Sequence, residues 1–257
     1  MKCERLRIKT ARGRLAQGVP SIEGQGDVIE YALGKCRGVI DVDEGFGDDN
    51  IVAFDGDLKE LPAIRLKRHG AAAQKLSGCR LEFGAGARGS YTLLIGSDPV
   101  RLSVGAETRC IVDIRFWRKP VVEIGAGTTI NGCKIVVDNA EVRIGPDCMF
   151  SDDVLVQAGD QHGLIDLETM LLTNTERKLI ELGEHVWIGR RAMVMSGVSI
   201  ASGCVLGAGA IATTSSKPCQ YLVGVPARAV RDNASWTRNP VGASAAEKSF
   251  FARMKQA

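Results

Sequence analysis

Aliphatic and small side chains recur at every sixth position between residues 182 and 217. Taken in sixes, the segment has an aliphatic first position: Leu182, Ile188, Val194, Ile200, Leu206 and Ala212. Its fifth position is small or aliphatic: Val186, Ala192, Val198, Cys204, Ala210 and Ser216. A period of six matches neither the turn of a helix, about 3.6 residues, nor the two-residue alternation of a free strand. It predicts short strands joined by tight bends, which build a narrow solenoid one wall at a time.

Residues 31–119 contain short β-prone pieces separated by Gly, Asp and Asn bends. They predict earlier, irregular coils of the same solenoid, with a short helix near residues 70–76. Ile-Gly or Val-Gly pairs recur at 95–96, 104–105, 124–125 and 144–145, so the register returns after each irregularity. Strict six-spacing resumes at Ile144, Phe150 and Val156.

The period stops at residues 158–181, which are polar and charged, and this predicts an excursion loop from the solenoid. From about residue 243 the tail has helix-forming composition, with Phe250 and Phe251 near one face. The chain therefore divides into an N-terminal arm (1–29), a solenoid (30–225) with the loop 158–181, and a C-terminal extension with a short helix (226–257). The expected class is all-β.

The composition narrows the class of function. Aromatic residues make up only 5%, which suits a thin core, and the net charge of +3 gives no reason to expect a nucleic acid or an acidic membrane as partner. The 8 cysteines are scattered without a CxxC pair, which favours reduced, structural thiols over a metal site. The sequence contains no apolar run long enough to predict a membrane span or a signal peptide. We therefore expect a cytoplasmic protein.

His162 is the candidate catalytic residue. It is the one histidine of the excursion loop, and Asp160 and Asp166 flank it. A histidine with a carboxylate partner can take a proton from a hydroxyl or an amine near neutral pH, as a general base does. The alternative is an exposed loop histidine without a role, and spacing alone leaves both open.

Four separated motifs carry a family resemblance: residues 144–169, LGEHVWIG (182–189), LGAGAIATT (206–214) and VGVPARAVRDN (223–233). Over residues 120–236 the chain resembles the hexapeptide-repeat acyltransferases, in particular those that acetylate sugars and surface polysaccharides. The resemblance implies a left-handed parallel β-helix, acetyl-CoA as co-substrate without a metal, a carbohydrate acceptor, and a homotrimer with active sites between neighbouring solenoids.

The resemblance also implies roles for individual residues. His162 is the base, and Trp187 lies beside the cleft for donor and substrate, together with Gly189, Asp160 and Asp166. Ala208 and Thr213 line the pantetheine arm, and Arg228 and Arg231 reach the phosphates of coenzyme A. The implied mechanism is direct transfer: His162 deprotonates a sugar hydroxyl, the oxygen attacks the thioester, and backbone N–H groups near Gly189 stabilise the oxyanion.

Three alternatives stay open. An N-acyltransferase acting on an amino sugar would use the same base. A solenoid of carbonic-anhydrase type would need several histidine ligands, but only 3 histidines exist and none pair at ligand spacing. A binding solenoid without catalysis is the third.

For several other residues that could suggest a function, a structural interpretation is simpler. The GAGARG stretch at 84–89 is followed by a strand-like run, which indicates a solenoid bend rather than a dinucleotide site. His185 is expected at a tight turn or in solvent, and Trp236 is expected to pack the C-terminal element against the helix.

Overall fold

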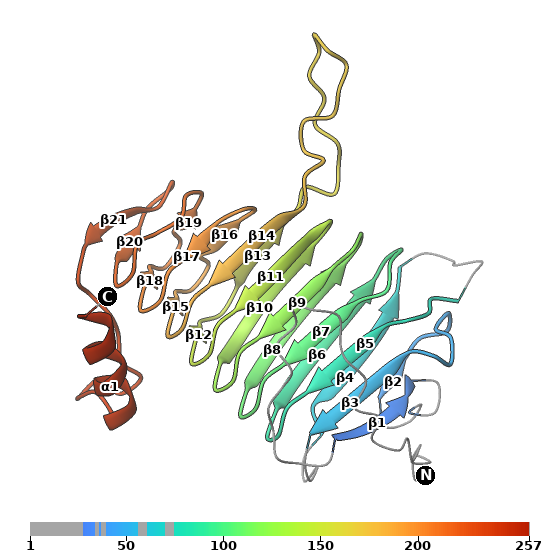
Figure 1. Ribbon diagram of the computed structural model, residues 1–257, viewed down its shortest axis with the longest axis horizontal. Coiled ribbons are helices and arrows are strands. Elements are labelled where there is room, and N and C mark those ends of the chain that lie inside the picture. Colours follow the sequence, from blue (N-terminus) through green and yellow to red (C-terminus); the bar gives the residue numbers. More distant parts are fainter. Residues whose placement is uncertain (1–27, 34–35, 37–39, 56–60, 70–74, 257) are drawn as a thin grey trace.

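The computed structural model describes residues 28–33, 36, 40–55, 61–69 and 75–256. Most of the predicted N-terminal arm, and residues 70–74 of the helix expected near 70–76, lie outside the described residues. Strands wind repeatedly around one long axis, and Figure 1 shows them stacked along it from β1 to β21.

One wall of the stack is an eight-stranded sheet. Its strands, in spatial order, are β1 (Val28–Ala32), β3 (Ile51–Asp55), β5 (Arg80–Phe83), β7 (Arg101–Val104), β9 (Val121–Ile124), β11 (Ala140–Ile144), β14 (Lys178–Leu182) and β17 (Ser199–Ile200). Neighbours are parallel except β1, which pairs antiparallel with β3. Strands from successive coils therefore form this sheet, as a solenoid requires.

A second sheet branches along its length. It begins with β2 (Asp41–Val42), β4 (Ala63–Arg68), β6 (Arg88–Ile95), β8 (Arg109–Phe116) and β10 (Thr129–Val137). One branch continues through β12 (Met149–Phe150), β15 (Trp187–Ile188), β18 (Val205–Leu206), β20 (Tyr221–Val223) and β21 (Arg228–Arg231). The other contains β13 (Val154–Ala158), β16 (Met193–Met195) and β19 (Ile211–Ala212).

The branch point explains where the period of six begins. The register of β8 and β10 shifts between Ile130 and Cys133, and both β12 and β13 pair with β10. In coils before this point the second sheet contributes one long strand, such as β6 and β8 with 8 residues each, whereas in coils after it two short strands take its place. The coils thereby change from two walls to three. Leu182 pairs with Ile200, a step of 200 − 182 = 18 residues or three sixes, whereas Leu81 pairs with Leu102, a step of 102 − 81 = 21. The early steps are unequal: 81 − 52 = 29 residues from Val52 to Leu81, 21 from Leu81 to Leu102, and 122 − 102 = 20 from Leu102 to Val122. The early coils are therefore irregular, as the sequence predicted, and longer than three sixes.

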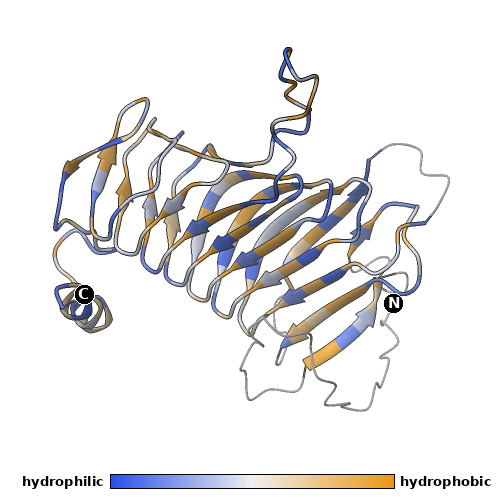
Figure 2. Ribbon diagram, turned by 45° about the horizontal axis from the view of Figure 1, so that its top comes forward, coloured by the Kyte–Doolittle hydropathy of each residue, from blue (hydrophilic) through white to orange (hydrophobic). Residues whose placement is uncertain are grey.

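The predicted inward positions form the core. All six first positions from Leu182 to Ala212 are buried, as are the fifth positions from Val186 to Ala210. The wider early coils hold the bulkiest buried side chains, including Phe83, Tyr91 and Phe116. Each buried aliphatic or aromatic side chain stabilises the stack by about 1.5–3 kcal/mol. Figure 2 shows the resulting alternation of hydrophobic and hydrophilic residues along the strands.

The glycines of the recurring Ile-Gly pairs allow close stacking of successive coils. A Cβ on Gly125 would lie 2.5 Å from the carbonyl carbon of Gly145 and from the nitrogen of Pro146. Both atoms belong to the backbone of the next coil, so neither can move aside as a flexible side chain could. Any side chain at this position must therefore separate two coils.

We expect Gly125→Ala to lower the free energy of unfolding by about 1–3 kcal/mol, the usual cost of overpacking. Gly242→Ala is the matched control, because nothing lies within 4 Å of a Cβ built there. Chemical denaturation of both variants checks this, and equal stability of the two would contradict the tight coil contact.

Residues 159–177, between β13 and β14, leave the stack, and Figure 1 shows them projecting far beyond the neighbouring coils. The segment folds back on itself, with an antiparallel bridge between Ile165 and Leu172. Asn174 ties its two arms together: its Oδ1 accepts from the Leu164 N–H at 2.8 Å, and its Nδ2 donates to the His162 carbonyl at 2.8 Å. Ala158 and residues 178–181, at the ends of the predicted loop, belong to strands.

The C-terminal helix is α1 (Ala245–Met254). Its N-terminus has a capping box, in which the Ser244 hydroxyl accepts from the Glu247 N–H at 3.2 Å and the Glu247 carboxylate accepts from the Ser244 N–H at 2.6 Å. Such a box satisfies backbone donors that a helix start leaves free. The helix lies against the last coils at one end of the stack (Figure 1).

Candidate functional site

His162 lies exposed in the projecting segment. Within the described residues its imidazole has no hydrogen-bond partner, and neither flanking carboxylate contacts it. Asp160 accepts from the Asn174 amide at 2.9 Å. Asp166 accepts from the backbone N–H and the hydroxyl of Thr169, at 2.8 and 3.0 Å, and these bonds hold the pKa of its carboxyl below the usual value. Both carboxylates therefore stabilise the fold of the segment. Within one chain, neither of them orients the His162 ring.

The projecting segment is less polar than the sequence interpretation of a polar and charged loop implied, because six large apolar side chains of it are exposed. Leu167 is 82% exposed, and five other large apolar side chains of the segment are also exposed: Leu164, Ile165, Met170, Leu171 and Leu172. Apolar side chains gathered in this way on a surface mark a contact site.

Trp187 and Gly189 lie on one edge of the three-walled coils. The half-buried Trp187 indole of β15 donates to the Ser151 hydroxyl at 3.4 Å. A Cβ on Gly189 would lie 2.6 Å from the Ala208 nitrogen, so these two predicted site residues are stacked neighbours. The Gly189 N–H already donates to the Leu206 carbonyl at 2.7 Å. It is therefore engaged in the ladder between coils and is not a free oxyanion donor.

The residues predicted to bind coenzyme A are all exposed. Ala208 follows β18, Thr213 follows β19, and Arg228 and Arg231 are the two ends of β21. Within the described residues neither arginine has an acidic group within ion-pair distance. Nη1 of Arg228 donates to the Ala227 carbonyl at 2.9 Å, and the other guanidinium donors are available to an anion. No hydrogen bond or ion pair among the described residues connects His162 to this group.

His185 is buried, with 1% of its surface exposed. Of the two positions that the sequence left open for it, a tight turn or solvent, the structure excludes solvent. The turn prediction holds, because its φ is +57°. Its Nδ1 lies 2.7 Å from a carboxylate oxygen of Asp147, and its Nε2 lies 3.0 Å from the Trp236 carbonyl. Each ring nitrogen of His185 therefore lies within hydrogen-bond distance of an oxygen atom. The ring stacks on Trp236 with 4.2 Å between centroids.

Arg238 and Asp147 extend this network between the C-terminal segment and the coils. The guanidinium of Arg238 donates to Asp147 Oδ1 at 3.0 and 2.8 Å. Burial opposes ionisation of Asp147, but the bonds from His185 and Arg238 outweigh it and hold the pKa of its carboxyl below the usual value. The stabilisation that the Asp147 carboxylate contributes is therefore fully present above its ordinary pKa, about 4, and is lost as the pH falls through the lowered pKa of the folded state.

Sequence reasoning located Trp236 but missed the His185–Asp147–Arg238 network. The Trp236 ring stacks on His185 and lies 6.2 Å from the ring of Trp187, so this residue packs the C-terminal segment against the coils. The partners are separated by 38 to 91 residues and follow no period, so only the coordinates reveal them.

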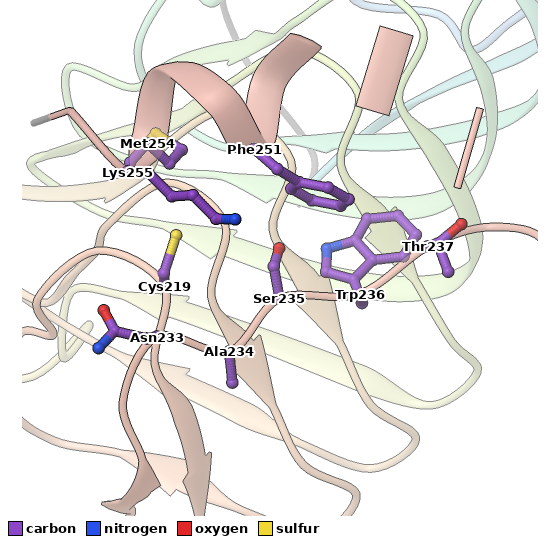
Figure 3. A pocket seen from close by; sticks show the side chains of 9 residues that line it. All are labelled: Cys219, Asn233, Ala234, Ser235, Trp236, Thr237, Phe251, Met254 and Lys255. Atoms are coloured by element: carbon purple, nitrogen blue, oxygen red, sulfur yellow. The ribbon is translucent and has the colours of Figure 1, made fainter. Parts of the chain in front are cut away.

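A cavity of about 630 Å³ opens between residues 233–237 and α1. Figure 3 shows Lys255 and Phe251 of the helix end on one side and Trp236 with Cys219 on the other. None of the residues predicted for catalysis or coenzyme binding lines it. Among the described residues, no helix is both long and apolar enough to cross a membrane.

Residues 180–213 match the family model described as bacterial transferase hexapeptide (six repeats). The polysialic acid O-acetyltransferase of Escherichia coli O1:K1 is 32% identical over 127 residues, which are 49% of this chain and 41% of the relative. The galactoside O-acetyltransferase of Escherichia coli K12 is 29% identical and aligns over 51% of this chain and 68% of its own length. The chain thus spans less than half of the polysialic acid enzyme that it matches.

Two solved structures share the fold over most of the chain. The polySia-specific acetyltransferase NeuO is 26% identical with a TM-score of 0.68, over 84% of this chain and 97% of that one. The polysialic acid O-acetyltransferase OatWY has a TM-score of 0.58 at 20% identity, over 73% of this chain and 95% of that one. The chain therefore carries the bacterial transferase hexapeptide repeat, and the predicted resemblance to hexapeptide-repeat acyltransferases of sugars and polysaccharides is confirmed.

Proposed function

We propose that this protein is an acetyl-CoA-dependent O-acetyltransferase that acts on a hydroxyl of a sugar or polysaccharide. The observation that carries the proposal is the likeness to a polySia-specific acetyltransferase over nearly the whole length of that chain. Three further features support it: the histidine on the projecting segment, the adjacent small residues Gly189 and Ala208, and the arginines of β21, which form no ion pair among the described residues.

His162 is the general base of the proposed reaction. Its imidazole takes the proton of the acceptor hydroxyl as that oxygen attacks the thioester carbonyl of acetyl-CoA. The new oxygen–carbon bond forms, the carbon–sulfur bond breaks, and the proton passes from the imidazolium to the departing thiolate. Because the Gly189 N–H is engaged, we assign the oxyanion contact to the next amide, that of Arg190, which has no acceptor among the described residues.

The residues on the donor side fit coenzyme A. Gly189 and Ala208 are adjacent and present almost no side chain, which leaves space along the edge for the pantetheine arm, with Thr213 beside the next turn. The exposed guanidinium groups of Arg228 and Arg231 suit its phosphates, since arginine binds phosphate oxygens bidentately. Trp187 borders the reaction centre from β15.

We propose that the active protein is a homotrimer of left-handed β-helices. In one chain the His162 segment projects away from the stack, and its six exposed apolar side chains need a surface to cover them. The outer face of β13, β16 and β19 offers such a surface, because Leu155, Met193 and Ile211 lie in register on it. The segment of one subunit then brings His162 to the residues proposed to bind the donor in the next subunit. We also propose the division into an N-terminal arm (1–29), a solenoid (30–225) and a C-terminal extension (226–257), and a cytoplasmic location.

Calorimetry with acetyl-CoA tests the donor. We expect micromolar binding by the wild type and loss of at least tenfold in affinity in Arg228→Ala/Arg231→Ala, because each charge-assisted bond contributes about 1.5–3 kcal/mol. Arg101→Ala is the control, since Arg101 is also exposed and forms no ion pair among the described residues. Absence of binding by well-folded wild type, or unchanged binding in the double variant, would contradict the donor assignment.

A further inference from the structure

The strand register places eight residues in one row along the outside of the second sheet. They are Arg88, Arg109, Thr129, Met149, Trp187, Val205, Tyr221 and Arg231, each paired with the next on the neighbouring strand. Their chain neighbours Cys110, Ile130, Phe150 and Ile188 point inward and are buried. We call this set the outer row. Trp187 stands near its middle, and the next member, Val205, is buried.

Arg88 and Arg109 form one end of the outer row and are directly opposed on β6 and β8. Like charges on facing positions of neighbouring strands repel each other, so the pair does not stabilise the sheet. Both side chains are exposed, and within the described residues neither forms an ion pair or a side-chain hydrogen bond. The acidic group next to them in sequence, Glu107, lies over Gly86 instead. Two unneutralised guanidinium groups are therefore held side by side.

The arginine pair lies in the same row of residues as Trp187, which borders the proposed reaction centre. Strands lie about 4.8 Å apart, so Arg109 is three steps, about 14 Å, from Trp187. Between them Thr129 and Met149 form an uncharged surface, and Arg238 lies alongside, donating to the Thr129 hydroxyl at 2.9 Å. Arg238 adds no free charge, because Asp147 neutralises it. The other end of the row carries Tyr221 and Arg231, on the side assigned to coenzyme A.

We propose that Arg88 and Arg109 bind carboxylate groups of an acidic polysaccharide, which lies along the outer row and presents one of its sugars at Trp187. This inference rests on the proposed function. Guanidinium groups pair bidentately with carboxylates, and two of them in register suit a chain with a negative charge on successive sugars. The outer row then orders both substrates in line, with the acceptor polymer toward β6 and the donor toward β21.

Binding of fluorescently labelled polymers to the full chain tests this proposal. Polysialic acid is the acidic probe, dextran the neutral one, and single-stranded DNA a polyanion without carboxylates. We expect polysialic acid to bind, with affinity falling as salt rises, and dextran not to bind. Arg88→Gln/Arg109→Gln should lose at least tenfold in affinity for polysialic acid, whereas Arg101→Gln, on the opposite sheet, should keep it.

Acetyl-CoA calorimetry on the same variants separates this inference from the proposed function. We expect the arginine variant to bind acetyl-CoA as the wild type does and to show a raised KM for the polymer. Unchanged affinity for polysialic acid in that variant, equal binding of dextran, or tighter binding of DNA would overturn the inference while leaving the donor site intact. Failure of the wild type to bind acetyl-CoA would instead remove the proposed function on which the inference rests.

Discussion

Replacing His162 with alanine is expected to lower the turnover number about 10²–10⁴-fold, the usual contribution of a general base. Acetyl-CoA binding should survive, because the donor contacts proposed for Ala208, Thr213, Arg228 and Arg231 do not involve the His162 imidazole. The drop should therefore appear in kcat and hardly in the dissociation constant of the donor. Steady-state rates together with calorimetry measure both quantities on one preparation.

His69→Ala is the matched control for this experiment. His69 is also exposed, and its ring contacts Trp117 with 4.6 Å between centroids, on coils far from the projecting segment in sequence. Its removal should leave turnover unchanged. If the His162 variant kept near-full activity, the base would have to be another group, and the role of the segment would reduce to subunit contact.

His185→Ala is expected to detach the C-terminal segment from the coils. The substitution leaves the Trp236 carbonyl and an Asp147 oxygen without their donor and opens a space beside the Trp236 ring. We expect a loss of about 2–4 kcal/mol in the free energy of unfolding, from unpaired polar groups and a cavity together. Limited proteolysis near residues 233–244 and the fluorescence of Trp236 should report the detachment before the coils unfold.

Arg253→Ala is the control for His185→Ala, because it removes an exposed ion pair of the C-terminal segment instead of the buried network. Arg253 joins α1 to Glu184 through two bonds of 2.8 and 2.9 Å, but its side chain is 62% exposed. An exposed pair contributes about 0–1 kcal/mol, so this variant should keep its C-terminal segment docked. Equal effects of the two substitutions would mean that His185 is only one of many minor contacts.

The sequence predicted the solenoid because the period of six is a local property of the chain. Each short strand needs only one inward aliphatic side chain per wall. The spacing of Leu182, Ile188 and Val194 therefore predicts the register from neighbouring residues alone. The change from two walls to three could not be predicted in this way. It depends on the irregularity between Ile130 and Cys133, which lets one long wall bend into two.

The site was harder to predict than the fold. His162 and Trp187 stood out through motifs, but the use of the Gly189 N–H depends on which carbonyl of the next coil faces it. The sequence left His185 at a tight turn or in solvent, because the groups that bury it, Trp236 and the Phe250 ring, come from the far end of the chain. Pairing across such separations leaves no pattern in the sequence.

Transfer of radiolabelled acetyl from acetyl-CoA to polysaccharide tests the central claim most directly. The assay compares wild type with His162→Ala, on polysialic acid and on an amino-sugar polymer, and treats the product with mild alkali, which cleaves esters and spares amides. We predict alkali-labile label on the hydroxyl acceptor, dependent on His162. Alkali-stable label would point to N-acylation, and the absence of any transfer by protein that binds acetyl-CoA would contradict the assignment as an O-acetyltransferase.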